Sequence, residues 1–244
     1  MIELRDIVKE YRGPLLGPRR RVRALDGVSL RVGAGEAVGV VGLNGAGKST
    51  LLRVLLGYVR PTSGRVEIGG LAAREYAERH GVSYLPERVA IPRGWTVRGA
   101  LWAYAMLDHL VEEEAGERVE AAMERLGIAA LADRRVGALS KGNLQRLAIA
   151  QLLLARRRLM VLDEPTDGLD PVWIAQLREI VAEWRAADPE RTLLLASHNL
   201  PEVERLTERV VVLHAGRVFE QVGVEGESLE ARFLRLAAGW EEAA

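Results

Sequence analysis

The fold is decided by the stretch Gly42-Leu43-Asn44-Gly45-Ala46-Gly47-Lys48-Ser49-Thr50, which contains the pattern G-x-x-x-x-G-K-[ST]. An apolar run, 37–41, precedes it, and a helix-like stretch, 51–56, follows it. Strand, glycine-rich loop and helix in this order are typical of a phosphate-binding loop rather than of an ordinary glycine-rich turn. Glycines let the backbone N–H groups face inward, and the helix N-terminus adds partial positive charge. We therefore expect a nucleotide site, with Lys48 at the β- and γ-phosphates and the Ser49 hydroxyl on Mg²⁺.

Length and composition restrict what kind of protein this is. A chain of 244 residues suits one large domain, or one domain with a subdomain. Its formal net charge of zero offers no argument for a nucleic-acid partner. The absence of cysteine excludes disulfides, thiolate metal sites and a cysteine nucleophile. The N-terminus shows no signal pattern, and no uncharged apolar run approaches the roughly 18 residues that a membrane helix needs, so any membrane role is expected to act through a partner.

The N-terminal part of the chain has the alternation of β-strands. We expect residues 2–8 to form an edge strand and residues 25–32 a second strand, with an exposed loop, 12–23, between them. A local basic cluster falls on this loop and consists of Arg19, Arg20, Arg21 and Arg23. A solvated hairpin tip is favoured for the cluster over a lipid or partner contact. Shorter strands are expected at 66–68 and 82–85.

The remainder of the chain predicts helices inserted into an alternating β/α sequence. Thr96 is placed to cap a helix, and residues 117–126 form a charged amphipathic helix ended by Gly127. Further elements are expected as strands at 159–162, 193–196, 210–213 and 217–222, and as helices at 172–186 and 228–236. The predicted fold class is α/β, a P-loop NTPase core with a mostly parallel sheet flanked by helices, an N-terminal antiparallel β region and an inserted helical subdomain. Its predicted parts are the core (1–87 and 156–222), the helical signature subdomain (88–155) and a short helical tail (223–244).

Two further stretches carry chemistry. Asp163-Glu164 follows the wholly apolar run 159–162, which we expect at the centre of a parallel sheet covered on both faces, with its carboxyl end at the ligand edge. Asp163 is placed to hold Mg²⁺ and Glu164 to polarise the water that attacks the γ-phosphate, whereas two helix-capping surface acids are the alternative. Ser140 is placed to N-cap a long helix, and together with Gly142 it could bind a second phosphate group, although alone it would be an ordinary helix start.

Taken together, these motifs resemble the ATP-binding cassette (ABC) ATPase family over essentially the whole chain. The matching motifs are the Walker A loop at 42–50, the signature at 139–143 followed by Gln145-Arg146, the Walker B strand and catalytic glutamate at 159–164, the D-loop at Gly168-Leu169-Asp170 and the switch histidine at His198. The resemblance implies that Glu164 and His198 are catalytic and that Ser49, Glu87 and Asp163 hold the metal. The nucleotide contacts it implies are Tyr11 on adenine, then Gly42, Asn44, Gly45, Gly47, Lys48, Ser49 and Thr50, and across a subunit interface Ser140, Gly142 and Asp170.

The chain departs from the family pattern at two motifs. Lys141 replaces the glycine that usually follows the signature serine, and Asn143 replaces its glutamine, while Ser140 and Gly142 are kept. At the Q-loop position, in Tyr84-Leu85-Pro86-Glu87, a glutamate replaces glutamine, and its carboxylate could coordinate Mg²⁺ or a bound water more strongly. We therefore expect a working site with an altered way of sensing the nucleotide.

The resemblance implies an ATP-binding and ATP-hydrolysing subunit that powers an ABC transporter through ATP-driven dimerisation, of the ABC-2 or drug-export type. Its cofactors would be ATP and Mg²⁺, and its partners a second cassette, as a homodimer or heterodimer, and an integral membrane permease. The expected location is cytoplasmic, on the inner face of the cell membrane, and the candidate permease contacts are Arg88, Ile91, Pro92 and Trp95. A copper-processing export subunit is a further subtype. The alternatives are a soluble ABC ATPase that drives a protein assembly such as iron–sulfur cluster biogenesis and, more remotely, a P-loop GTPase or kinase.

Overall fold

The computed structural model describes residues 1–12, 21–224 and 228–241. The strands are β1 (Ile2–Arg12), β2 (Arg21–Val32), β3 (Ala37–Val41), β4 (Ser63–Ile68), β5 (Leu71–Ala72), β6 (Ser83–Leu85), β7 (Leu159–Asp163), β8 (Thr192–Ala196), β9 (Arg209–His214) and β10 (Arg217–Gly223). The helices are α1 (Lys48–Leu55), α2 (Ala73–His80), α3 (Val97–Leu107), α4 (Glu112–Arg125), α5 (Lys141–Leu152), α6 (Pro171–Ala186), α7 (Leu200–Leu206) and α8 (Leu229–Glu241), with short 3₁₀ helices η1 (Ala129–Leu131) and η2 (Val136–Ala138).

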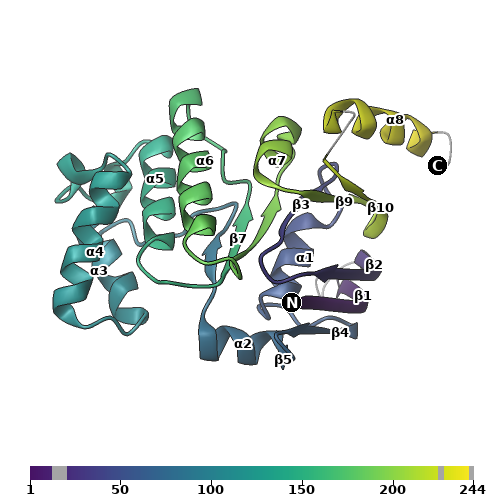
Figure 1. Cartoon of the computed structure of the whole chain (residues 1–244), viewed down its shortest axis with the longest axis horizontal. Coiled ribbons are helices and arrows are strands. Elements are labelled where there is room, and N and C mark those ends of the chain that lie inside the picture. Colours follow the sequence, from purple (N-terminus) through teal and green to yellow (C-terminus); the bar gives the residue numbers. More distant parts are fainter. Residues whose placement is uncertain (13–20, 225–227, 242–244) are drawn as a thin grey trace.

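A six-stranded sheet runs through the middle of the molecule in the order β10-β9-β3-β8-β7-β6 (Figure 1). The five strands from β9 to β6 are parallel, and β10 pairs with β9 in the antiparallel sense. Alternate side chains point to opposite faces of a strand, so Val38 and Val40 pack on one face of β3 while Ala37 and Val41 pack on the other. Both faces are therefore covered, as the apolar runs predicted, although β7 lies one strand from the edge rather than at the centre.

The second sheet is antiparallel and has the order β2-β1-β4-β5. The predicted edge position of residues 2–8 is wrong, because β1 pairs with β2 on one side and with β4 on the other. The apolar side chains of this sheet share a cluster with α1 and with one face of the six-stranded sheet. Helix α1 contacts β2, β7 and β8, so it lies between the two sheets. This packing holds the start of α1 against the carboxyl end of β3.

Helices α3, α4 and α5 form one end of the molecule (Figure 1). The Thr96 hydroxyl accepts a hydrogen bond from the Gly99 N–H at 3.0 Å, and Ser140 accepts one from the Asn143 N–H at 3.2 Å, which confirms both predicted N-caps. Buried side chains of these three helices join one continuous apolar cluster with the adjacent face of the six-stranded sheet, with α6 and with α8. The division between core and helical subdomain stays a prediction.

Several boundaries differ from the sequence-based expectation. Arg12 ends β1 and residues 21–23 begin β2, so these parts of the expected loop are strand, while residues 13–20, which include Arg19 and Arg20, lie outside the described residues. Helix α4 begins at Glu112 rather than at 117, with three glutamates in its first turn that suit the positive end of the helix. Helices α2 and α7, of eight and seven residues, were not predicted.

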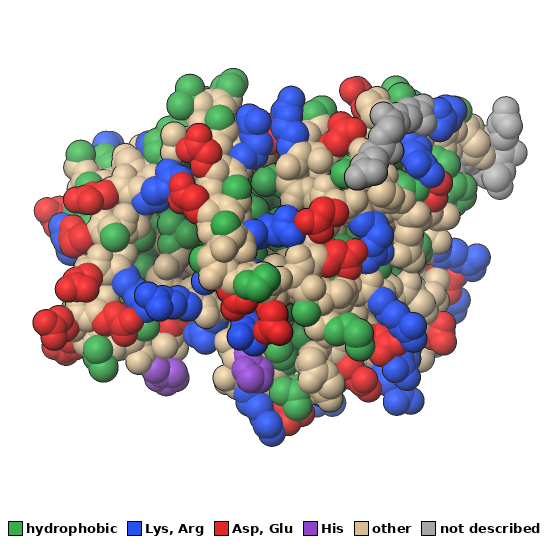
Figure 2. Space-filling view, in the orientation of Figure 1, with side chains coloured by type: hydrophobic (Ala, Val, Ile, Leu, Met, Phe, Trp, Pro, Cys, Tyr) green, Lys and Arg blue, Asp and Glu red, His purple; other side chains and the backbone are tan. Residues whose placement is uncertain are grey.

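The C-terminal helix α8 packs on α7. Leu229 and Phe233 face the core and are buried, and Arg232 pairs with Glu220 of β10 at 2.6 Å. Among the described residues, no helix is long and apolar enough to cross a membrane. On the face shown in Figure 2, acidic and basic side chains are interspersed over the described surface rather than gathered by sign.

Candidate functional site

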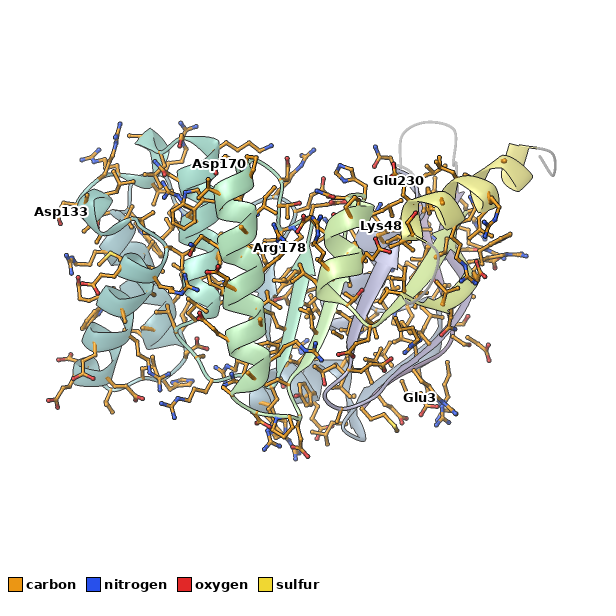
Figure 3. The ribbon with its side chains drawn as sticks, turned by 45° about the horizontal axis from the view of Figure 1, so that its top comes forward. Glu3, Lys48, Asp133, Asp170, Arg178 and Glu230 are labelled. Carbon is orange, nitrogen blue, oxygen red and sulfur yellow. The ribbon has the colours of Figure 1, made fainter. Side chains whose placement is uncertain are left out.

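The loop between β3 and α1 has the conformation that its glycines predict. Gly45 and Gly47 adopt positive φ angles of 81° and 108°, a region that favours glycine. The Lys48 side chain, 8% exposed, folds back so that its Nζ donates to the Gly42 carbonyl at 2.8 Å. Figure 3 shows Lys48 among the elements at the centre of the molecule. The loop thus presents a helix N-terminus and one ammonium group to the same space.

Gly42 is required for a different reason, close packing. A Cβ atom on Gly42 would lie 2.3 Å from the Leu213 carbonyl oxygen and 3.0 Å from the Ala46 side chain. The first of these neighbours is backbone of β9, which cannot move aside as a flexible side chain can. Gly42 therefore lets the phosphate loop lie directly against the neighbouring strand.

Asp163 lies at the end of β7, close to the start of α1. Its Oδ1 lies 3.4 Å from Ser49 Oγ, and its side chain is only 1% exposed. Burial raises the pKa of Asp163 to about 6, the nearby carboxylates of Glu87 and Glu164 act in the same direction, and the hydrogen bond from Ser49 opposes them. A cation bound beside the Ser49 hydroxyl would offset the negative charge of this buried carboxylate and of the acids near it.

Glu164 has a strained backbone and a well-held side chain. Its φ is 51°, an uncommon value for a residue with a side chain. Its Oε2 accepts hydrogen bonds from Ser197 Oγ at 2.8 Å and from the His198 N–H at 3.2 Å, and it lies 2.9 Å from His198 Nδ1. The structure therefore joins the two residues predicted as catalytic and adds Ser197, which the sequence analysis missed.

A cavity of about 510 Å³ opens over the phosphate loop. Its lining combines predicted nucleotide, metal and catalytic residues with Ala24, Ala46 and Asp167, which were not predicted as contacts. The full set is Ala24, Asn44, Gly45, Ala46, Gly47, Lys48, Ser49, Thr50, Glu87, Glu164, Asp167 and His198. Gly42 lines a smaller cavity of about 180 Å³ nearby, together with His198 and Phe233 of α8. Because the glycine-loop, Glu87, Glu164 and His198 come from separate parts of the chain, their common cavity marks a single site.

The signature residues lie outside the described lining of this cavity. Ser140 and Gly142 begin α5, and Gly142 packs so closely that an added Cβ would lie 3.1 Å from the Gly168 carbonyl oxygen. Gln145, buried in the same helix, donates to the Pro165 carbonyl at 2.9 Å. The signature helix α5 is thus attached to the loop after Glu164. Its exposed N-terminus does not contribute Ser140 or Gly142 to the described lining of the cavity in its own chain.

Three other predicted residues also lie outside the described lining of this cavity: Asp163, which is buried beside Ser49, Asp170 and Tyr11. Asp170 caps α6, where its Oδ1 accepts hydrogen bonds from the backbone N–H groups of Val172 and Trp173 at 3.0 and 3.1 Å, and Figure 3 places it at the start of that helix. Tyr11, on β1, is exposed, and the Lys9 ammonium lies 5.1 Å from its ring centroid. Roles for Asp170 at a subunit interface and for Tyr11 on adenine stay predictions.

The residues of this site fit a polyphosphate with a magnesium ion. Inward-facing backbone N–H groups and one ammonium suit phosphate oxygens. The Ser49 hydroxyl and the Asp163 carboxylate are oxygen ligands of the kind that Mg²⁺ prefers, and the raised pKa of Asp163 reflects a charge that burial leaves without a cation. Glu87, which lines the cavity, adds a third oxygen group.

Comparison with known sequences gives concordant matches. Residues 25–167 match the protein family described as ABC transporter. The zinc import ATP-binding protein of Paracoccus denitrificans is 40% identical over 193 residues, which cover 78% of this chain and 69% of that protein. The daunorubicin resistance ATP-binding protein of Streptomyces coeruleorubidus is 36% identical over 201 residues, which cover 82% of this chain and 63% of that protein. The chain thus spans less than two thirds of the length of this second relative.

Comparison with solved structures agrees. The ATP-binding subunit of an ABC transporter superimposes with a TM-score of 0.84 at 28% identity, covering 97% of this chain and 99% of that one. This likeness confirms the α/β fold with a P-loop that the sequence predicted.

Proposed function

Since the chain belongs to the ABC transporter family, we propose that it is the nucleotide-binding subunit of a transporter and that it binds and hydrolyses ATP with Mg²⁺. The observation that carries the proposal is the cavity in which the phosphate loop faces Glu87, Glu164 and His198. Asn44, Gly45, Gly47, Lys48, Ser49 and Thr50 would hold the phosphates. Ser49, Asp163 and Glu87 would hold Mg²⁺, which would neutralise charge on the β- and γ-phosphate oxygens.

Glu164 is proposed as the group that activates water for hydrolysis. The water oxygen attacks the γ-phosphorus, the bond to the ADP oxygen breaks, and the carboxylate accepts the proton from water. In the free chain this carboxylate already accepts hydrogen bonds from Ser197 and His198. These contacts orient Glu164 and keep it from turning away, and His198 lies beside it to contact the γ-phosphate.

A second cassette is proposed to complete the site. Ser140 and Gly142 do not line the cavity of their own chain, yet their helix N-terminus is suited to a phosphate group. Two chains packed head to tail would place these residues of each chain over the nucleotide of the other, with Asp170 at the contact. ATP would then hold the subunits together, because it binds the paired state more tightly than the separate chains.

A membrane permease is proposed as the further partner. Among the candidate contacts, Arg88 and Pro92 are exposed and Trp95 is 43% exposed, which fits a docking residue better than a core residue. Ile91 is buried in the apolar cluster, so its side chain supports the segment and is not available for contact. Through this partner the subunit would lie on the inner, cytoplasmic face of the cell membrane.

Export of the ABC-2 type is the proposed direction of transport. It rests on Lys141 in the signature, on the Q-loop segment that ends in Glu87, and on the C-terminal helix α8. The names of the relatives do not agree on one direction of transport, since one is a daunorubicin resistance protein and another is a zinc import protein. The second candidate function, a soluble ABC ATPase that drives a protein assembly, is tested by co-purification from membranes, which should recover a multi-span protein if the transporter proposal holds.

The ATP mechanism is tested with Glu164→Gln, which keeps the shape of the side chain but removes the base. With saturating MgATP this variant should form dimers in sedimentation velocity and lose ATP hydrolysis, while Lys48→Ala should lose nucleotide binding and stay monomeric. Arg74→Gln on the exposed face of α2 is a matched control, since it removes one partner of a surface ion pair. Nucleotide binding by a Glu164→Gln variant that remains monomeric would contradict the proposed dimer.

A further inference from the structure

The substituted position of the signature forms a specific ion pair. Lys141 Nζ lies 2.8 Å from Asp167 Oδ1 and 2.9 Å from Oδ2, so one ammonium contacts both carboxylate oxygens. Lys141 begins α5, and Asp167 lies in the loop between β7 and α6. The pair therefore joins the signature helix to the loop that follows Glu164.

The backbone beneath the pair is shaped to receive the lysine. Gly168 has a φ of 81°, and a Cβ placed there would lie 2.9 Å from three carbons of the Lys141 side chain. The aliphatic stem of Lys141 thus crosses directly over Gly168 before its ammonium reaches Asp167. Gly142 also packs against Gly168, since a Cβ on Gly142 would lie 3.1 Å from the Gly168 carbonyl oxygen, and Gln145 donates to the Pro165 carbonyl. These contacts hold both partners of the pair in place.

Asp167 is also part of the nucleotide cavity. The described lining contains the carboxylates of Glu87, Glu164 and Asp167 but a single lysine, Lys48. A polyphosphate brings several negative charges into this space, and an uncompensated carboxylate at Asp167 would repel them. Lys141 does not line the cavity, but its charge lies within hydrogen-bond distance of the Asp167 carboxylate.

We propose that Lys141 is a positioning residue for nucleotide binding, which as the counter-ion of Asp167 offsets a negative charge at the cavity of its own chain. The inference rests on the proposed function, since it takes a nucleotide polyphosphate as the ligand. It also gives a role to the lysine at a signature position where glycine is usual, because the adjoining loop carries an acidic residue within reach of its ammonium. Because both side chains are largely exposed, the effect is screened by salt.

The test measures MgADP affinity by titration calorimetry of the dilute full-length chain, because ADP probes the chain's own cavity without a γ-phosphate to bridge two subunits. Lys141→Gln should weaken MgADP binding by about two- to fivefold at low salt. The double variant Lys141→Gln/Asp167→Asn should restore it, and Lys141→Arg should retain most of it. The loss should shrink as ionic strength rises from about 0.05 M to about 0.5 M.

The controls separate this inference from the proposed function. Arg74→Gln removes one charge from an exposed ion pair elsewhere and should leave the affinity unchanged. If the unaltered chain binds no MgADP, or Lys48→Ala binds it equally well, the proposed function fails. If nucleotide binds but Lys141→Gln binds with unaltered affinity, or Asp167→Asn does not restore the loss, the charge role of Lys141 is overturned. A lowered melting temperature that Asp167→Asn does not restore would likewise assign Lys141 a purely structural role.

Discussion

Ser49 Oγ lies 3.4 Å from Asp163 Oδ1, although the two residues are 114 positions apart in the sequence. The contact exists because β3 and β7 flank β8 in the same parallel sheet, which brings their carboxyl ends to one edge. It buries a carboxylate that has one hydroxyl partner and acidic neighbours. The buried charge destabilises the free protein at neutral pH, and the Mg²⁺ that we propose for this site would offset it.

Asp163→Asn should stabilise the metal-free protein at neutral pH. The pKa of Asp163 is raised in the folded chain to about 6 from a reference value of 3.8. At pH values between these two pKa values, the native state therefore holds a proton that the unfolded state has lost. The free energy of unfolding therefore falls as the pH rises through this range. Asparagine cannot ionise, so the variant avoids this loss of stability. Denaturant unfolding should show a gain of roughly 1–3 kcal/mol above pH 6 that vanishes below about pH 4.

Adding Mg²⁺ gives a second test of the buried charge at Asp163, since a bound cation would offset that charge without a substitution. With nucleotide present, Mg²⁺ should raise the melting temperature of the unaltered chain, and its removal by a chelator should reverse the rise. Asp163→Asn should show a much smaller response. A gain in stability that stays the same at pH 4 and pH 7 would show that the buried charge is not its cause.

Gly42→Ala should destabilise the fold. The new methyl group would meet the Leu213 carbonyl oxygen at 2.3 Å, so either β9 or the phosphate loop must shift. We expect a loss of roughly 1–3 kcal/mol in the free energy of unfolding, together with weaker nucleotide binding. Gly94→Ala is the matched control, since a Cβ at Gly94 has no atom within 4 Å and should change stability little.

Gln145→Leu should reveal how strongly the signature helix is attached to the loop after Glu164. The substitution preserves size but leaves the buried Pro165 carbonyl without its hydrogen-bond donor. Thermal or chemical unfolding should show a loss of about 1–3 kcal/mol. Gln221→Leu on β10 removes only an exposed hydrogen bond from Arg209, so it should cost less, about 0.5 kcal/mol. Equal effects at the two positions would argue against a specific attachment.

His198→Ala should reduce catalysis with little effect on folding. The side chain is 70% exposed and its Nδ1 lies 2.9 Å from Glu164 Oε2, so its removal should loosen the carboxylate that we propose as the base rather than the core. We expect kcat for ATP hydrolysis to fall by about 10- to 100-fold, with the melting temperature nearly unchanged. Normal kcat in this variant would exclude a role for the histidine in holding Glu164.

Sequence reasoning succeeded where a pattern is local. The phosphate loop, the strand before Asp163 and the caps at Thr96 and Ser140 each depend on a few adjacent residues, and the structure has all of them. The family resemblance predicted Glu164 and His198 as catalytic residues, but their contact is seen only in the structure.

Features that depend on distant pairing were not predictable. β1 alternates as an edge strand would, and only its pairing with β4, more than 50 residues away, places it inside the sheet. The inclusion of Asp167 in the cavity and its ion pair with Lys141 likewise depend on how α5 lies against the loop after β7. Neither residue carries a signal of this contact, because an acid near a helix start and a lysine in a signature are each common surface features.

The apolar cluster that extends from α3 through the sheet to α8 has a consequence for how the chain melts. Helices α3, α4 and α5 have no separate core of their own among the described residues; they share buried contacts with the sheet. Loss of either part would expose the apolar face of the other, so the two should unfold together. Calorimetry should record one cooperative transition rather than two, and the helical insertion should not be excisable as a stable fragment.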